Sequence, residues 1–345
     1  MAKSGILSTR ENNRIKVHYA WIYVTERCNL HCDYCFFRHK GLKDISLQAV
    51  NRFFSLFKYH QTEPSTLILS GGEPFLAKDL LYQILEKAKR FLKKTSLHIQ
   101  TNGVLIDKKD IKYLKSLKVS LEFGIDGYFD VTTRHRRGLK PDTFNRLTDN
   151  IKECMKADLA CGTTMTVHPR EASRIREGVT FLKDLGFPHM DVTPAAFMTW
   201  DKDAQACFKR NYLAILKNKD LRSLMYAQED KEMIRPGDMD LSLHPPGHLL
   251  AGDPFLCLPE NKRQEFSIWD IKTGQIRQEV LSFYQEAYKR LYNGRPYLTY
   301  REFVMHHFKL VNKMMGYAYL NAGAINNILK FLQRAHVKIC IKNDQ

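Results

Sequence analysis

The sequence predicts an α/β protein in which six βα units form an incomplete, TIM-like (βα)6 barrel, followed by a mainly helical C-terminal cap. Two observations support this prediction. From about residue 18 to residue 217, short apolar runs alternate with longer amphipathic stretches, and this alternation stops after residue 225. Strands that alternate with helices of this length form right-handed βαβ units and a parallel sheet. The 345 residues suffice for one such barrel and an appendage.

Six apolar runs have the length and composition of strands: Tyr19–Val24, Thr66–Ser70, Ser96–Gln100, Val119–Ile125, Thr163–Val167 and Met190–Thr193. Helices are predicted between and after them, over Leu47–Lys58, Asp79–Lys93, Lys108–Leu117, Pro141–Ala157, Glu171–Leu185 and Ala204–Leu216. Because six units do not close an eight-stranded barrel, we expect a curved, open sheet with the chemistry at the carboxyl ends of its strands.

The last third of the chain has a different character. Residues 235–254 are rich in Pro, Gly, His and Asp and predict a loop, and a short hairpin is expected around residues 266–276. From Glu279 onward the pattern is helical, with one break near residues 293–296. We therefore expect three parts: an N-terminal arm (1–17), a core barrel (18–225) and a C-terminal cap domain (226–345).

Charge and composition limit the function classes. The formal net charge of +17, from 54 Lys+Arg against 37 Asp+Glu, favours acidic partners: nucleic acid, a phosphorylated small molecule, an acidic leader peptide or an anionic membrane surface. The basic residues are spread along the chain, so nucleic-acid binding is not the first expectation. The N-terminus is polar and no apolar stretch approaches the length of a membrane span, so we expect a cytoplasmic protein with reduced thiols and no membrane partner.

Three cysteines, Cys28, Cys32 and Cys35, form a C-x3-C-x2-C run directly after the first predicted strand. Clustered cysteines in a reducing compartment indicate a metal or redox site rather than a disulfide framework. Three thiolates can bind three corners of a cubane [4Fe–4S] cluster and leave the fourth iron open to a small molecule. A zinc site completed by His31 or His39 is the alternative.

Small and polar residues follow the next three predicted strands. Ser70-Gly71-Gly72-Glu73-Pro74 ends the second strand, Thr101-Asn102-Gly103 the third and Gly124-Ile125-Asp126-Gly127 the fourth. Paired glycines let a backbone approach a ligand closely, and a glutamate can pair with a cationic amine. Each segment alone could be an ordinary turn. Because the carboxyl ends of parallel strands share one rim, the three together predict a ligand cradle.

This combination resembles the radical S-adenosylmethionine (radical SAM) enzymes. The resemblance rests on the C-x3-C-x2-C run with Tyr34 before its last cysteine, followed by GGEP, TNG and IDG in the family's order over about residues 18–200. It implies that Cys28, Cys32 and Cys35 ligate one [4Fe–4S] cluster, whose open iron chelates S-adenosyl-L-methionine (SAM). Reductive cleavage of SAM would give a 5′-deoxyadenosyl radical that abstracts a substrate hydrogen.

The same resemblance assigns SAM-binding residues. The amino group of SAM would meet the GGEP turn, the adenine would lie near the aromatic residue of the cysteine run, and the ribose is expected near the TNG turn. The residues concerned are Gly71, Gly72, Glu73, Pro74, Tyr34, Thr101 and Asn102.

The stretch GIDGYFDVTTRHRRGLKPDTF is similar to the S-x-D-G … H-D … R … G-T-F stretch of peptide-modifying members of this family. The alignment places Arg136 where the family's arginine meets the carboxylate of SAM, with Arg134 and Arg137 as neighbouring alternatives. Thr132-Thr133 replaces the usual His-Asp pair. Asp126 is expected either to bind substrate or to cap the turn after its strand.

Peptide-modifying relatives often end in a SPASM domain, a cysteine-rich extension that binds auxiliary clusters. The chain has Cys257 and Gly274 at a spacing near that of the domain's opening motif, but Glu279 occupies the position of its second cysteine. The region is either a degenerate, cluster-free SPASM domain or a coincidence. Only Cys257 and Cys340 lie beyond the predicted barrel, so we expect one [4Fe–4S] cluster and no auxiliary cluster.

The function expected from the resemblance is modification of a peptide or protein side chain. One alternative is a phosphorylated or nucleotide-type small molecule or tRNA as substrate, which the charge of +17 would suit. A second is a non-catalytic iron–sulfur electron carrier, which would have no use for the GGEP turn. Expected partners are the substrate and an electron donor such as flavodoxin or ferredoxin. Because the N-terminal arm is too short for a leader-binding domain, a separate peptide-delivery protein is also expected.

Overall fold

The computed structural model describes residues 17–35, 37, 41–195, 198–225, 232–234, 241–251, 263–264, 267–282 and 298–299. Several predictions concern residues outside these ranges. They are the first sixteen residues of the N-terminal arm, Cys257, His39 and most of the helical cap. Residues 278–282 are helical, as the sequence predicts from Glu279 onward.

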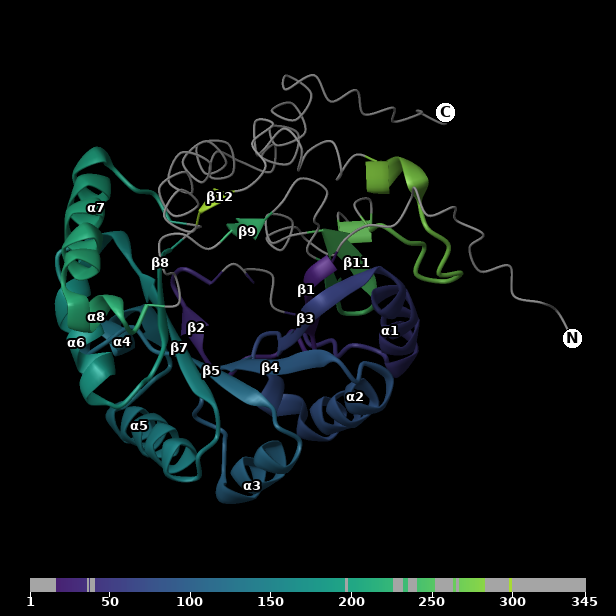
Figure 1. The fold of residues 1–345 in the computed structure, drawn as a ribbon, viewed down its shortest axis with the longest axis horizontal. Coiled ribbons are helices and arrows are strands. Elements are labelled where there is room, and N and C mark those ends of the chain that lie inside the picture. Colours follow the sequence, from purple (N-terminus) through teal and green to yellow (C-terminus); the bar gives the residue numbers. More distant parts are fainter. Residues whose placement is uncertain are drawn as a thin grey trace, which may run out of the picture.

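A curved eight-stranded sheet in the order β11-β10-β1-β3-β4-β5-β7-β8 forms the centre of the structure (Figure 1). Six adjacent strands of this sheet pair in parallel with one another: β1 (Val17–Tyr23), β3 (Gln61–Ser70), β4 (Thr95–Thr101), β5 (Ser120–Gly124), β7 (Cys161–Val167) and β8 (Met190–Pro194). They are the six strands that the sequence predicts, so the incomplete TIM-like barrel is confirmed.

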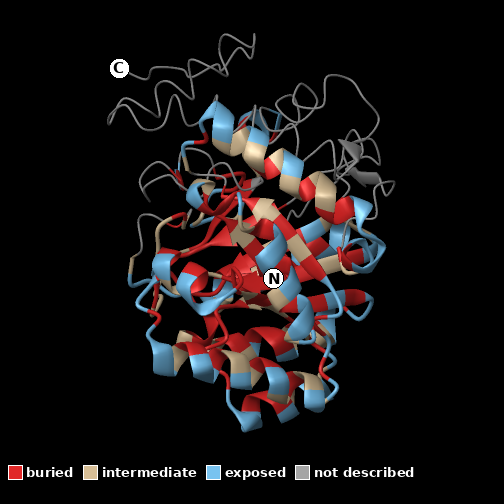
Figure 2. Cartoon of the chain, turned by 90° about the vertical axis from the view of Figure 1, so that its left-hand side faces the viewer, coloured by how far each residue is buried: buried red, intermediate tan, exposed pale blue. Residues whose placement is uncertain are grey.

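Helices cover the convex face of this sheet (Figure 1). They are α1 (Leu47–His60), α2 (Lys78–Phe91), α3 (Lys108–Ser116), α5 (Pro141–Lys156), α6 (Ile175–Asp184) and α7 (Lys202–Lys217). Their apolar faces pack on alternate strand residues such as Leu67, Ile99 and Phe123, which are completely buried. Figure 2 shows the buried residues on the strands and the inner helix faces, and the exposed residues on the outer helix faces. The concave face of the sheet lines the interior of the barrel.

Local sequence explains where several helices begin. Ser46 caps α1, Asp107 forms a capping box with Asp110 at α3, and Asp201 caps α7. Pro141 occupies the first turn of α5, where its missing N–H costs nothing. These signals are local, which explains why the positions of the helices follow from the sequence.

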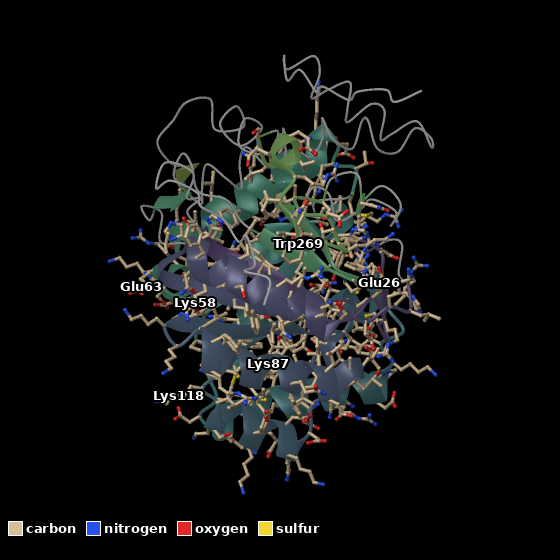
Figure 3. The ribbon with its side chains drawn as sticks, turned by 90° about the vertical axis from the view of Figure 1, so that its right-hand side faces the viewer. Glu26, Lys58, Glu63, Lys87, Lys118 and Trp269 are labelled. Atoms are coloured by element: carbon tan, nitrogen blue, oxygen red, sulfur yellow. The ribbon has the colours of Figure 1, made fainter. Side chains whose placement is uncertain are left out.

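The prediction of a loop over residues 235–254 is wrong in part. β10 (Leu241–His244) and β11 (His248–Ala251) form a hairpin, and β10 pairs in parallel with β1. Strands of four residues around a Pro-Pro-Gly turn give too short a pattern to predict. The hairpin expected around residues 266–276 agrees with an antiparallel bridge between Trp269 and Ile276. Trp269, labelled in Figure 3, donates from Nε1 to Gly247 O at 2.7 Å, which links this turn to the β10–β11 hairpin.

Short elements that the sequence does not predict complete the described part of the chain. They are β2 (His31–Cys32), η2 (Pro74–Ala77), α4 (Phe129–His135), β6 (Arg136–Arg137), η3 (Pro169–Glu171), α8 (Lys219–Arg222), β9 (Glu232–Ile234) and β12 (Leu298–Thr299). Among the helices described, none has the length and apolar character that a membrane span needs.

Candidate active site

Cys28, Cys32 and Cys35 lie in the loop that follows the carboxyl end of β1, at the rim of the barrel. We call residues 24–35 the cysteine loop. Each is a half-buried thiol. Cys28 and Cys32 pack against the main core, and Cys35 packs against the buried rings of Tyr23 and Phe37. The loop therefore presents three thiols from a partly apolar environment.

Backbone pairing positions this cysteine loop. β2 and β6 are antiparallel and pair Cys32 with Arg136. Asp33 N–H donates to His135 O at 2.8 Å, and Cys35 N–H donates to Cys32 O at 3.2 Å. The second cysteine and the arginine that the sequence assigns to SAM are thus neighbours across a two-stranded ribbon.

The donor set fits an iron–sulfur cluster. In the part of the chain that the structure describes, no three His, Cys, Asp or Glu side chains are grouped as the ligands of a single metal ion are. A cubane cluster does not need this convergence, because each thiolate binds a different iron. Phe37 limits solvent beside Cys35, and the Arg136 guanidinium is close enough to Cys32 for their charges to interact. Both features suit an iron–sulfur cluster that is ligated by thiolates.

The GGEP turn packs directly on the cysteine loop. Gly72 N–H donates to Thr25 O and Glu73 N–H donates to Arg27 O, both at 2.8 Å. A Cβ on Gly71 would lie 2.5 Å from Thr25 O, and one on Gly72 would lie 2.1 Å from Arg27 O. Gly71 also has φ of +147°, which favours glycine. The close backbone approach that the two glycines predict is made here to the cysteine loop.

The Glu73 carboxylate is fully buried and accepts hydrogen bonds from the protein. Phe75 N–H donates to it at 3.1 Å, and the Thr101 hydroxyl and Asn102 N–H each donate at 2.8 Å. Burial raises the pKa of Glu73 to about 7, although these hydrogen bonds lower it. The side chain therefore links the GGEP and TNG turns. A ligand amine at this turn would meet its backbone, and Pro74 begins η2 directly after it.

Asn102 extends the same network to the cysteine loop. Its Nδ2 donates to Asn29 Oδ1 at 2.8 Å, and its Oδ1 accepts from Val104 N–H at 3.1 Å. Thr101 Oγ1 accepts from Gly103 N–H at 3.0 Å. Both polar side chains thus shape the rim from within, and their contacts to the SAM ribose stay a prediction.

Tyr34, Asp126 and Arg136 form a buried cluster at the rim. Asp126 Oδ1 and Oδ2 accept from Arg136 Nη2 and Nε at 2.9 and 3.0 Å, and Oδ2 also accepts from the Tyr34 hydroxyl. The guanidinium lies over the Tyr34 ring, 5.5 Å from its centroid. A Cβ on Gly124 would lie 2.7 Å from Arg136 Nη1, so this glycine makes room for the arginine. Thr166 N–H donates to Asp126 Oδ1 at 3.0 Å. The carboxylate of Asp126 therefore anchors Arg136.

The structure distinguishes the three arginines that the sequence offers for the SAM carboxylate. Arg134 pairs with Glu171 at 2.7 Å, and Arg137 pairs with Asp33 at 2.6 Å, and both arginines are more than half exposed. Arg136 is buried and lies beside the cysteine loop. Its contact with the carboxylate of SAM stays a prediction, and burial beside the cysteine loop distinguishes it from Arg134 and Arg137.

Sequence reasoning missed a pair of histidines behind the cysteine loop. The rings of His135 and His168 stack with centroids 3.9 Å apart and planes 11° apart. His135 Nδ1 lies 3.4 Å from Asp33 Oδ2, and its Nε2 lies 3.1 Å from Glu171 Oε1. Burial and the neighbouring imidazole lower the pKa of His168 to about 4. The only signal in the sequence is that His135 precedes Arg136, which does not reveal a partner in the turn after β7.

Residues 22–191 match the family model of the radical SAM superfamily. This stretch contains the cysteine loop, the GGEP and TNG turns, and the Tyr34–Asp126–Arg136 cluster. The chain therefore belongs to the radical SAM superfamily through this domain, and the resemblance noted from the motifs is confirmed. Members of the family are enzymes that use a [4Fe–4S] cluster and SAM, with a substrate and a reductant.

Two curated relatives illustrate the range of this family. A GTP 3′,8-cyclase from Clostridium acetobutylicum is 31% identical over 158 residues, which are 41% of this chain and 45% of the relative. A cysteine-type anaerobic sulfatase-maturating enzyme from Clostridium perfringens is 23% identical over 208 residues, 55% of this chain and 56% of the relative. The chain thus spans about half the length of these relatives, whose names describe different substrates.

A solved structure described as native anSMEcpe with bound AdoMet and Cp18Cys peptide is similar to most of the chain. It aligns over 93% of this chain and 99% of its own with a TM-score of 0.64 and 14% sequence identity. At this identity the similarity shows the fold.

Proposed function

We propose that this chain is a radical SAM enzyme that modifies a side chain of a peptide or protein. The observation that supports the proposal best is the hydrogen-bonded rim. The three thiols lie in the loop that follows β1, and both the Glu73 network and the buried Arg136 contact this loop. An electron carrier needs the thiols alone, whereas this rim also builds a place for an amino acid moiety beside them.

In this proposal each part of the rim has one task. Cys28, Cys32 and Cys35 hold the cluster, the backbone of the GGEP turn binds the amino group of SAM, and Arg136 binds its carboxylate. Tyr34 lies near the adenine. When bound, the cluster and SAM supply a 5′-deoxyadenosyl radical that can abstract hydrogen from an unactivated C–H bond. The three thiolates need a reducing compartment, in agreement with the cytoplasmic location expected from the sequence.

The peptide class is supported by two observations. The chain is similar over nearly its whole length to a protein whose structure contains a bound peptide. The GIDG…RG…F stretch that resembles peptide-modifying members folds here around Asp126 and Arg136. A flavodoxin or ferredoxin as electron donor and a peptide-delivery protein are part of this proposal.

A nucleotide-type substrate is the second candidate. It is favoured by the 31% identity to a GTP 3′,8-cyclase and by the net charge of +17.

Deuterium transfer tests the two candidates side by side. The anaerobically reconstituted protein is mixed with dithionite and SAM, then with either a peptide digest of a proteome grown in D2O or a deuterated nucleotide pool that includes GTP. We expect deuterium in 5′-deoxyadenosine, detected by mass spectrometry, from the peptides alone. Deuterium from the nucleotides alone, or formation of no 5′-deoxyadenosine at all, would overturn the proposal.

A further inference from the structure

The concave face of the sheet carries polar side chains where a closed barrel is filled with branched aliphatic ones. β4, β5, β7 and β8 contribute Gln100, Glu122, Thr164 and Asp191 at neighbouring positions. Adjacent residues of the same strands, such as Phe123, belong to the buried core under the helices. Because successive side chains of a strand point to opposite faces, these four residues face the interior of the barrel. We call them the interior row.

Contacts between adjacent strands order this row. The sheet register pairs Gln100 with Glu122, and Thr164 with Asp191. Gln100 Nε2 donates to Glu122 Oε1 at 3.2 Å, and the Thr164 hydroxyl donates to the same oxygen. The Glu122 carboxyl group is therefore held in one orientation by two donors that carry no positive charge.

Asp191 supplies the observation that indicates a ligand. Its Oδ1 is shielded from solvent and has no hydrogen-bond partner among the residues that the structure describes. A buried carboxylate oxygen without a donor costs free energy that a bound cation would recover. Burial and the like charge of Glu122 raise the pKa of Asp191 to about 7, and burial also raises the pKa of Glu122. Both carboxylates would thus gain from a positive charge between them.

We infer that the interior row is the part of the substrate site that binds a cationic group, an amine or guanidinium such as a lysine or arginine side chain of a peptide. Glu122 and Asp191 pair with the cation, and Gln100 and Thr164 orient Glu122. The inference rests on the proposed function and deepens it. Two carboxylates at this place would repel the phosphates of a nucleotide. The acidic interior also contrasts with the net charge of +17 of the chain as a whole.

Competitive retention of small peptides tests the inference. The full-length holoprotein with SAM is dialysed anaerobically against an equimolar mixture of tripeptides Ala-X-Ala, where X is lysine, arginine, norleucine, glutamate or phosphoserine. We expect the lysine and arginine peptides to bind about tenfold more tightly than the norleucine peptide, as one charged hydrogen-bonded contact allows. Equal retention, or preference for the glutamate or phosphoserine peptide, would overturn the inference.

Matched variants test whether the preference for cationic peptides depends on Glu122 and Asp191. The double variant Glu122→Gln/Asp191→Asn should lose the preference for cationic peptides and keep SAM binding. The control Glu63→Gln/Asp158→Asn removes the same charge from side chains that are 58% and 98% exposed, and should keep the preference. Loss of SAM binding in the double variant would instead assign these carboxylates to SAM and reject the inference.

The stability of the double variant can be measured separately from its peptide binding. Neutral amides avoid the cost of burying a charge, so the double variant should unfold at the same temperature as the parent or higher. If the double variant does not fold, Asp191→Asn alone serves, because Asp191 Oδ1 has no hydrogen bond to lose among the residues that the structure describes. Deuterium transfer from peptides without a preference for cations would reject the interior row as a cation site and leave the proposed function standing.

Discussion

Arg263 Nη1 lies 3.0 Å from Glu26 Oε1, and both side chains are almost completely buried. The Arg263 guanidinium also lies 5.5 Å from the centroid of the Phe37 ring. Glu26, labelled in Figure 3, stands two residues before Cys28, and Phe37 stands two residues after Cys35. One side chain from beyond the barrel therefore contacts both flanks of the cysteine loop.

Arg263→Met should destabilise the protein and its metal site together. Removing the cation leaves Glu26 as a buried charge without a cationic partner among the described residues, and such a charge typically costs about 3 to 5 kcal/mol. Anaerobic urea denaturation measures the stability, and iron per chain after reconstitution measures the site. The double variant Glu26→Gln/Arg263→Met removes the orphaned charge and should recover part of both. Unchanged stability and iron content in Arg263→Met would contradict a structural role for this pair.

Each of Cys28→Ala, Cys32→Ala and Cys35→Ala should abolish stable iron binding and SAM cleavage, because two thiolates cannot hold a cubane cluster. Iron and sulfide per chain and the visible absorption of the reconstituted protein measure this loss. Cys207→Ala is the matched control, since Cys207 is also a half-buried thiol but lies in α7. If one of the three variants kept a full cluster, the proposed ligand set would be wrong.

Gly72→Ala should displace the cysteine loop. The new Cβ would lie 2.1 Å from Arg27 O, a backbone atom that cannot move without the loop. We expect a loss of about 2 kcal/mol or more in the free energy of unfolding, with faster loss of iron to a chelator. Gly186→Ala is the control, because Gly186 has φ of +104° but, among the described residues, its Cβ would meet only the side chain of Met155. That variant should lose stability and release iron at the parent's rate. Equal iron release in both variants would refute the specific role of Gly72.

Glu73 should give the protein a distinct pH dependence. Burial raises its pKa from 4.5 to about 7, so the folded state prefers the protonated acid. Its contribution to stability is therefore most favourable below pH 4.5 and declines as the pH rises to about 7. Between pH 5 and pH 8 the parent should lose about 2 kcal/mol through this group, and Glu73→Gln should not. Urea denaturation of both proteins across this range gives the difference, and a difference independent of pH would contradict the assignment.

The barrel and its motifs could be predicted because their signals are local. Each of the six strands is an apolar run, and its turn residues come directly after it in the sequence. The position of the cysteine loop and of the turns at the rim can therefore be predicted from the strands. The roles inside the rim could not be predicted in the same way. Gly71 was a candidate for contact with a ligand from its residue type alone, and its neighbour Thr25 is visible only in three dimensions.

Long-range partners and short strands limit the prediction further. Glu26 and Arg263 are 237 positions apart, and no periodicity links them. The strand β10 has four residues and lies beside a proline pair, so its pattern resembles that of a loop. Glu122 and Asp191 each stand in an apolar run, where one acidic residue does not weaken the prediction of a strand.

The β10–β11 hairpin gives the chain beyond residue 225 a part in the barrel itself. Without it, the outer side of β1 would present unpaired N–H and C=O groups next to the cysteine loop, and such an edge invites pairing with other molecules. A fragment that ends at residue 225 would keep every radical SAM motif and still lack β10, the strand that pairs with this edge of β1. The smallest portion able to work alone should therefore extend past Ala251.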